Sequence, residues 1–271
     1  MVAAGWMYGV ASGNRIGATS ALLMMGWLTV VLWLDGDGSL WLQRALGLAT
    51  WGVLVLALRQ VTPTVRVQTG VVVAFATLVE VVFSPTLHVY VYRFDNVPAY
   101  VPPGHGLVYL SAFALGHSAL VQRHLRAWTA AVLTGGGAWA GYGLLLADRP
   151  DTLGAFWFLC LAAFLLVGPS KPVYVGAFLA VTYLELVGTS IGNWAWQSED
   201  PILGVSIGNP PSGAAGGYGW FDLAGLLAAP YLLGLLSRVR GRDPAGGPGP
   251  APDRRAGRAG RRPAAEAVDA R

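Results

Sequence analysis

Long apolar segments follow one another along most of the sequence and are separated by short polar turns. About 20 apolar residues in a helix cross the hydrocarbon core of a bilayer. A helix also pairs every backbone N–H and C=O within its own segment, which lipid requires. The sequence therefore predicts an all-α, polytopic membrane helix bundle. We expect eight spans, at residues 16–34, 40–58, 69–91, 105–122, 127–147, 153–168, 173–192 and 218–236.

The composition of the chain favours a membrane protein over a soluble one. Apolar residues make up 54% of the sequence and charged residues 12%. Charged residues are about 25% of an ordinary soluble domain, and a soluble fold of this length needs more charge on its surface. We therefore expect membrane lipid as the main surroundings of residues 1–236.

The basic residues are concentrated at the C-terminal end. Residues 237–271 contain nine arginines and four acidic residues, and no apolar periodicity. This composition predicts a disordered basic tail. The rest of the chain has nine basic and ten acidic residues, so the positive net charge does not indicate a nucleic-acid partner.

The turns between the predicted spans alternate in charge. One set, together with the tail, is basic and contains Arg15, Arg59, Arg66, Arg123, Arg126 and Lys171. The other set is mostly acidic and contains Asp35, Asp37, Asp95, Asp148, Asp151, Glu199 and Asp200. Basic residues collect on the cytoplasmic side of membrane proteins. The sequence therefore predicts a multi-pass protein of the plasma (cell) membrane with both termini in the cytoplasm.

Two stretches of the chain look like copies of one another. Each has a glutamate in an apolar segment, a hydroxyl side chain four residues later, an aromatic-x-aromatic pair and a Pro-Pro loop. The first consists of Glu80, Ser84, Tyr90, Tyr92 and Pro102-Pro103, and the second of Glu185, Thr189, Trp194, Trp196 and Pro210-Pro211. The glutamates fall in the third and seventh predicted spans. We therefore predict two parallel four-helix repeats, related by a pseudo-two-fold axis along the membrane normal.

The two glutamates are the candidate catalytic residues. A carboxylate inside a bilayer is costly and normally faces a cavity or a partner. If the repeats meet at their axis, Glu80 and Glu185 point into one cavity, where they can act as an acid and a base. The alternative is structural: each glutamate is neutral and hydrogen-bonds a neighbouring helix.

Polar and aromatic residues near the glutamates are the candidate substrate-binding residues. They are His88, His105, Ser84, Thr189, Asn193, Trp194, Trp196, Tyr90 and Tyr92. The aromatic members also fit the belt that aromatic side chains form at membrane interfaces. No HxxxH or HExxH spacing is present, so we expect no metal and no other cofactor.

A short run of the second stretch resembles a known membrane family. The run Glu185-Leu-Val-Gly188-Thr189-Ser-Ile-Gly192-Asn-Trp194-Ala-Trp196 is similar to the acid–glycine–aromatic pattern of carotenoid biosynthesis proteins. This family includes hydratases that add water to an end-group double bond of long polyenes. The resemblance implies that Glu185 is the acid and that Glu80 is its partner. The loop at 208–217 departs from the pattern.

Three classes of function remain open on these patterns. The first is an intramembrane enzyme that acts on an isoprenoid or another lipid. The second is a transporter or carrier of a small or lipophilic solute, which parallel repeats and a proline-broken helix favour. The third is a structural membrane subunit whose polar residues only join helices. The sequence predicts neither the substrate nor the oligomeric state.

Overall fold

The computed structural model describes residues 13–239. The chain divides into two units, Met1–Leu233 and Gly234–Arg271. The first contains nearly all of the described elements. Of the predicted tail, residues 240–271 lie outside the described residues.

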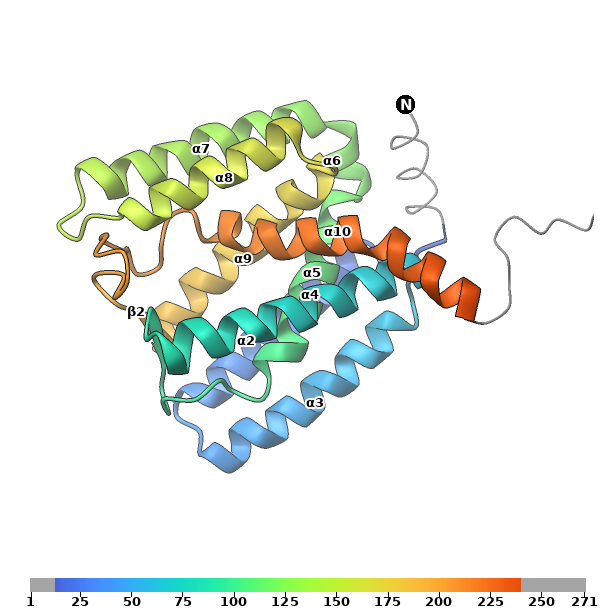
Figure 1. The fold of residues 1–271 in the computed structure, drawn as a ribbon, viewed down its shortest axis with the longest axis horizontal. Coiled ribbons are helices and arrows are strands. Elements are labelled where there is room, and N and C mark those ends of the chain that lie inside the picture. The colour runs from blue at the N-terminus through green and yellow to red at the C-terminus, as the bar shows by residue number, and fades with distance from the viewer. Residues whose placement is uncertain (1–12, 240–271) are drawn as a thin grey trace, which may run out of the picture. The chain divides into compact units, whose positions relative to one another are not determined.

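Eight long helices occur in the described part, in the order of the eight predicted segments. They are α2 (Ala18–Gly36), α3 (Leu40–Leu58), α4 (Pro63–Val81), α5 (Val101–Gly116), α7 (Leu125–Leu145), α8 (Thr152–Val167), α9 (Lys171–Ile191) and α10 (Ala214–Val239). The short elements are a π-helical turn η1 (Val82–Thr86), helix α6 (Ala119–Arg123) and strands β1 (Tyr90–Tyr92) and β2 (Trp194–Trp196). The all-α prediction is confirmed, apart from one two-stranded ribbon (Figure 1).

Within residues 13–239, five helices are long and apolar enough to cross a membrane. They are α2, α3, α4 together with η1, α9 and α10. Many large apolar side chains on the helices are exposed, among them Leu48 at 77% and Val167 at 85%. Exposed apolar surface on this scale marks contact with lipid or a partner. The findings therefore fit a multi-pass membrane protein.

Prolines explain where several helices begin and end. Pro63, Pro102 and Pro172 occupy the first turns of α4, α5 and α9, where the missing N–H costs nothing. Pro85 lies in η1, where it interrupts the hydrogen bonds of the preceding helix. The predicted span 69–91 is wrong at its end for this reason: Tyr90 and the two residues after it form β1, not helix.

The centre of the first unit is the contact between α5 and α9. These two helices pack extensively on each other, and α2, α3 and α4 also pack on α5. Most residues of α5 are buried. A Cβ on Gly176 of α9 would overlap the carbonyl oxygen of Ala112 in α5. Small residues thus allow close backbone approach, as is common between membrane helices.

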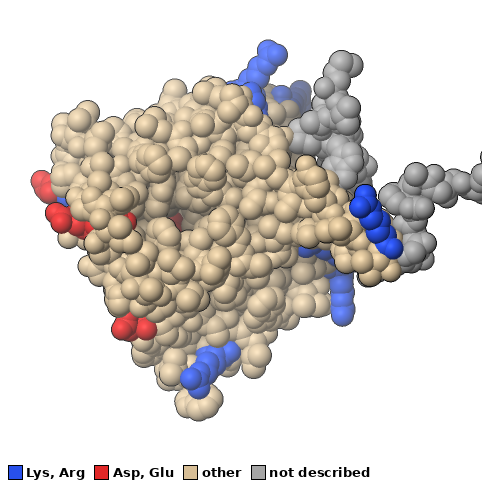
Figure 2. All heavy atoms as spheres, in the orientation of Figure 1, with Lys and Arg blue, Asp and Glu red and all other residues tan. Residues whose placement is uncertain are grey.

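Charges in the first unit are separated as the sequence predicts. Figure 2 shows acidic side chains gathered at the end where β2 is labelled in Figure 1. The turns at the opposite helix ends carry Arg59, Arg66, Arg123 and Lys171. We call these the acidic end and the basic end of the bundle.

Replacing Gly176 by Ala should destabilise the bundle, because the new methyl group has no room against α5. Overpacked cores lose about 1–3 kcal/mol. Thermal unfolding of the purified protein in lipid nanodiscs measures the effect. The matched control is Gly52→Ala in α3, where an added Cβ meets nothing within 4 Å. Equal melting temperatures for the two variants would contradict the close contact of α5 with α9.

Candidate functional site

The two aromatic-x-aromatic pairs lie on neighbouring strands. β1 and β2 are antiparallel, with Tyr90 opposite Trp196 and Tyr92 opposite Trp194. The ring centroids of these cross-strand pairs are 4.5 Å and 6.1 Å apart. Because side chains alternate along a strand, all four rings project from one face of the ribbon. The pairing joins segments that are about a hundred residues apart in the sequence.

Glu80 receives hydrogen bonds from its own aromatic pair and from α5. Its Oε2 accepts from the hydroxyls of Tyr90 and Tyr92, at 2.8 and 2.9 Å. Its Oε1 lies 2.9 Å from Nε2 of His105. Glu80 is 6% exposed. Three side chains from β1 and α5 therefore hydrogen-bond the two oxygens of this buried carboxyl group.

Glu185 has the same relation to its own aromatic pair but fewer donors. Its Oε2 accepts from the indole N–H groups of Trp194 and Trp196, at 3.0 and 3.1 Å. Its Oε1 accepts no hydrogen bond from the residues that the structure describes. The two glutamates therefore differ: Glu80 is fully hydrogen-bonded, and Glu185 has one oxygen left for another group.

Both glutamates line a single cavity of about 260 Å³. Its other walls are mostly apolar or aromatic and come from α2, α4, α5, α8, α9 and α10. They include Leu28, Phe83, Val108, Trp157 and Tyr218. The shared cavity expected from the sequence is thus present in the geometry. The few polar groups in it belong largely to Glu80, Glu185 and their donors.

The cavity reaches the side of the bundle between α4 and α10. Phe75 of α4 and Trp220 of α10 line the cavity and are 36% and 48% exposed. The surface is hollowed near the acidic end on the face shown in Figure 2. In a membrane, a mouth between two bilayer-length helices opens toward lipid, which suits a lipophilic ligand.

Four predicted binding residues do not line the cavity. Ser84 is buried in η1, and Thr189 donates to the backbone carbonyl of Glu185. His88 is half exposed beside Asp95, with 3.8 Å between Nε2 and Oδ1. Asn193 belongs to a separate polar network around Asp35. The other predicted residues, His105 and the four strand aromatics, do line it.

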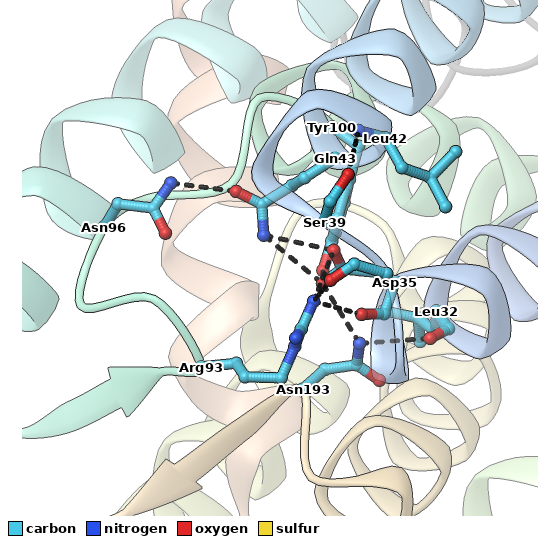
Figure 3. A network of polar contacts seen from close by, with 10 residues as sticks. Leu32, Asp35, Ser39, Leu42, Gln43, Arg93, Asn96, Tyr100 and Asn193 are labelled. Atoms are coloured by element: carbon cyan, nitrogen blue, oxygen red, sulfur yellow. Dashed lines mark hydrogen bonds and ion pairs between the residues drawn. The ribbon is translucent and has the colours of Figure 1, made fainter.

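Asp35 is the centre of that network, which Figure 3 shows at the acidic end. It lies at the end of α2 and is fully buried. Its carboxylate accepts from Gln43 (3.1 Å), Tyr100 (2.8 Å) and Asn193 (3.3 Å). Arg93 pairs with it at 3.5 Å and donates to its backbone carbonyl. The network ties α2, α3, the loop before α5 and the start of β2 together.

Tyr100 stays a hydrogen-bond donor in this network. Burial raises its pKa above the usual phenol value, and the neighbouring Asp35 charge raises it further. The phenol therefore remains protonated at any physiological pH. The network does not depend on pH through this group.

Asp151 makes a similar junction between α7 and α8. It caps α8 through Gly154 N–H (3.0 Å). It also accepts from Gly208 N–H (2.8 Å) and from the backbone and hydroxyl of Ser212 (2.6 and 2.7 Å). Arg149 beside it donates to the carbonyl of Trp196 at 2.7 Å. This junction fixes the loop before α10 and the end of β2.

Sequence patterns missed Trp157 as a cavity residue and Asp35 and Asp151 as structural centres. Trp157 lies in an apolar helix, where nothing in the sequence distinguishes it from a lipid-facing aromatic. Asp35 precedes Gly-Asp-Gly and Asp151 follows Asp-Arg-Pro, which are typical of exposed turns. Their burial depends on partners far away in the sequence.

Comparisons with known proteins give no match: no family model fits the chain, and neither a curated protein nor a solved structure is similar to it. Within residues 13–239, no group of three or more His, Cys, Asp or Glu residues is arranged to hold a metal ion. The chemistry of the site is therefore argued from its own side chains.

Replacing Asp35 by Asn should destabilise the protein by about 3 kcal/mol, because it breaks a buried ion pair with Arg93. It also replaces one accepting carboxylate oxygen by an NH₂ group, which would face other hydrogen-bond donors. Thermal unfolding in nanodiscs measures the loss. The control is Asp37→Asn, two residues away and exposed, which should change the melting temperature little. A harmless Asp35→Asn substitution would show that the network does not hold the loops.

Proposed function

We propose that the protein is a membrane-embedded acid/base enzyme that acts on an isoprenoid or another lipophilic, unsaturated substrate. The observation that carries this proposal is the pair of buried glutamates in one cavity with unequal hydrogen bonding. Environments that differ in this way separate an acid from a base. Water addition to a carbon–carbon double bond is the reaction that uses both.

In this reaction Glu185 is the acid. Its Oε1 has no partner among the described residues, so it can hold a proton that faces the cavity. The proton passes to one carbon of the double bond, a C–H bond forms, and the other carbon becomes cationic. The aromatic side chains of Tyr90 and Trp196 line the cavity, and aromatic rings stabilise nearby cations.

Glu80 is the base. Tyr90, Tyr92 and His105 hold its carboxyl group at the cavity wall, where the carboxylate takes a proton from a water molecule as the water oxygen bonds to the cationic carbon. The proton then returns from Glu80 to Glu185, which restores the starting state. Atoms balance: the substrate gains one water, and the protein ends unchanged.

Two further observations support a lipophilic substrate. The side mouth at Phe75 and Trp220 would admit a ligand from the bilayer. A cavity of about 260 Å³ suits one end of a long polyene, whose remainder would extend between α4 and α10 into lipid. The resemblance of the Glu185–Trp196 run to carotenoid biosynthesis proteins implies the same class of substrate.

We also propose that all eight long helices cross a plasma membrane with both ends cytoplasmic, and that α2–α5 and α7–α10 are duplicated halves. Three equivalent features support the duplication. Each half has a glutamate bound by its own aromatic pair, and the two strands pair about the centre Val91–Ala195. Each half also has a buried aspartate near the end of its first helix, Asp35 in the last turn of α2 or Asp151 shortly after α7, bound to the loop before its fourth helix.

A proton-coupled carrier is the second candidate. The observation that favours it is a further buried acid, Asp222 in α10, which lies between the cavity residue Phe221 and the contact of Gly225 with Gln68 near the basic end. Buried protonatable groups also occur along the proton paths of transporters. The lipid-profile experiment below separates the two candidates.

Replacing Glu185 or Glu80 by Gln should lower turnover by about 10²–10⁴-fold, because general acid or base catalysis is lost. The assay is mass spectrometry of lipids from polyene-producing cells with and without the gene, where the product is heavier by one water. The control is Glu199→Gln, an exposed acid, which should keep wild-type turnover. An unchanged lipid profile with the wild-type gene, together with proton-dependent uptake into vesicles, would favour the carrier instead.

A further inference from the structure

A second cluster of buried polar side chains lies farther from the acidic end of the bundle than Glu80 and Glu185. Asp222 of α10 is 4% exposed, and its Oδ2 has no hydrogen-bond partner among residues 13–239. The hydroxyl of Tyr174 in α9 is fully buried and also has none. Asp222 interacts electrostatically with Tyr174 and with Tyr109 of α5. Tyr109 in turn donates to Oε1 of Gln68 in α4 at 2.9 Å.

The position of the cluster follows from the neighbours of Asp222 along α10. Tyr218 and Phe221, just before it, line the cavity. Gly225, after it, packs against the backbone of Gln68, near the start of α4. The cluster therefore lies between the cavity and the basic end of the bundle, and three helices besides α10 contribute to it.

No positive charge balances Asp222. None of the ion pairs among the described residues involves it. The titratable groups that face it are the phenols of Tyr109, Tyr174 and Tyr218, which ionise only near pH 10 or above. An isolated carboxylate in a low-dielectric interior costs so much that the group normally takes up a proton instead.

Unpartnered polar atoms at this depth also need an explanation. Buried polar groups are nearly always hydrogen-bonded to protein or to ordered water. The free Asp222 oxygen and the free Tyr174 hydroxyl come from different helices, and no direct hydrogen bond joins them. A proton on the carboxyl group and a bridging water would together satisfy both.

We propose that Asp222, Tyr109 and Tyr174 form a buried proton-binding site, completed by water, in which Asp222 carries the proton. Tyr218 lines the cavity and interacts electrostatically with Asp222, Glu80 and Glu185. This inference goes beyond the proposed reaction and holds whether the cavity serves an enzyme or a carrier.

Infrared spectroscopy of the purified protein in nanodiscs at neutral pH tests the proposal without any substrate. The wild type minus Asp222→Asn difference spectrum should contain one C=O band of a protonated carboxyl group, and D₂O should shift it. Asp37→Asn, which removes an exposed acid, should give no such band. A difference spectrum of Asp222→Asn with only carboxylate bands would overturn the proposal.

Tyr174→Phe provides the second variant, because it removes only a hydroxyl without a partner and should leave the fold intact. The Asp222 band should persist in this variant and change frequency, since the carboxyl group loses a neighbouring hydroxyl or the water it holds. An unchanged band would overturn the three-residue site. The same band should remain in Glu185→Gln, so an inactive cavity does not affect the result.

Discussion

The hydrogen bonds between each buried glutamate and the aromatic pair that follows it are the interactions on which the site depends. A carboxyl group in a bundle of apolar helices needs donors, and neither α4 nor α9 supplies them. The chain reverses after each helix and returns as a three-residue strand whose phenols or indoles reach the glutamate. The two strands then pair with each other. This pairing holds both glutamates at one cavity and closes the cavity at the acidic end.

The loops that position the strands depend on a second set of buried charges. Asp35 and Asp151 accept hydrogen bonds from the loops before α5 and α10 and from the start of β2. Arg93, which follows β1, donates to the carbonyl of Gly38, and Arg149 donates to the carbonyl of Trp196 in β2. The close contact of α5 with α9 sets the distance between the halves of the cavity. Helix packing thus fixes the walls of the cavity, and the hydrogen bonds of Asp35 and Asp151 fix the loops at its acidic end.

The sequence was sufficient to predict the long helices and to suggest that the two glutamates face one cavity. Apolar length predicts the helices, and the cost of a carboxylate in lipid predicts that Glu80 and Glu185 face a cavity. It was not sufficient for the ribbon, because three residues are too few to show a strand pattern. Nor did it indicate that Tyr92 donates to Glu80, since the chain first reverses at Pro85. Asn193 was expected in the site and lies instead with Asp35, a partner far away in the sequence.

The ribbon pairs about one central position, Val91 opposite Ala195, so a strand of this kind can pair equally well with a second copy of itself. Under the proposed duplication, a half-length ancestor would have assembled the whole cavity as a homodimer, with two identical acids. Joining the halves in one chain removes that identity. One glutamate can then keep phenols and a histidine while the other keeps indoles. On this proposal, gene fusion would let a symmetric pocket give its two carboxyl groups different roles.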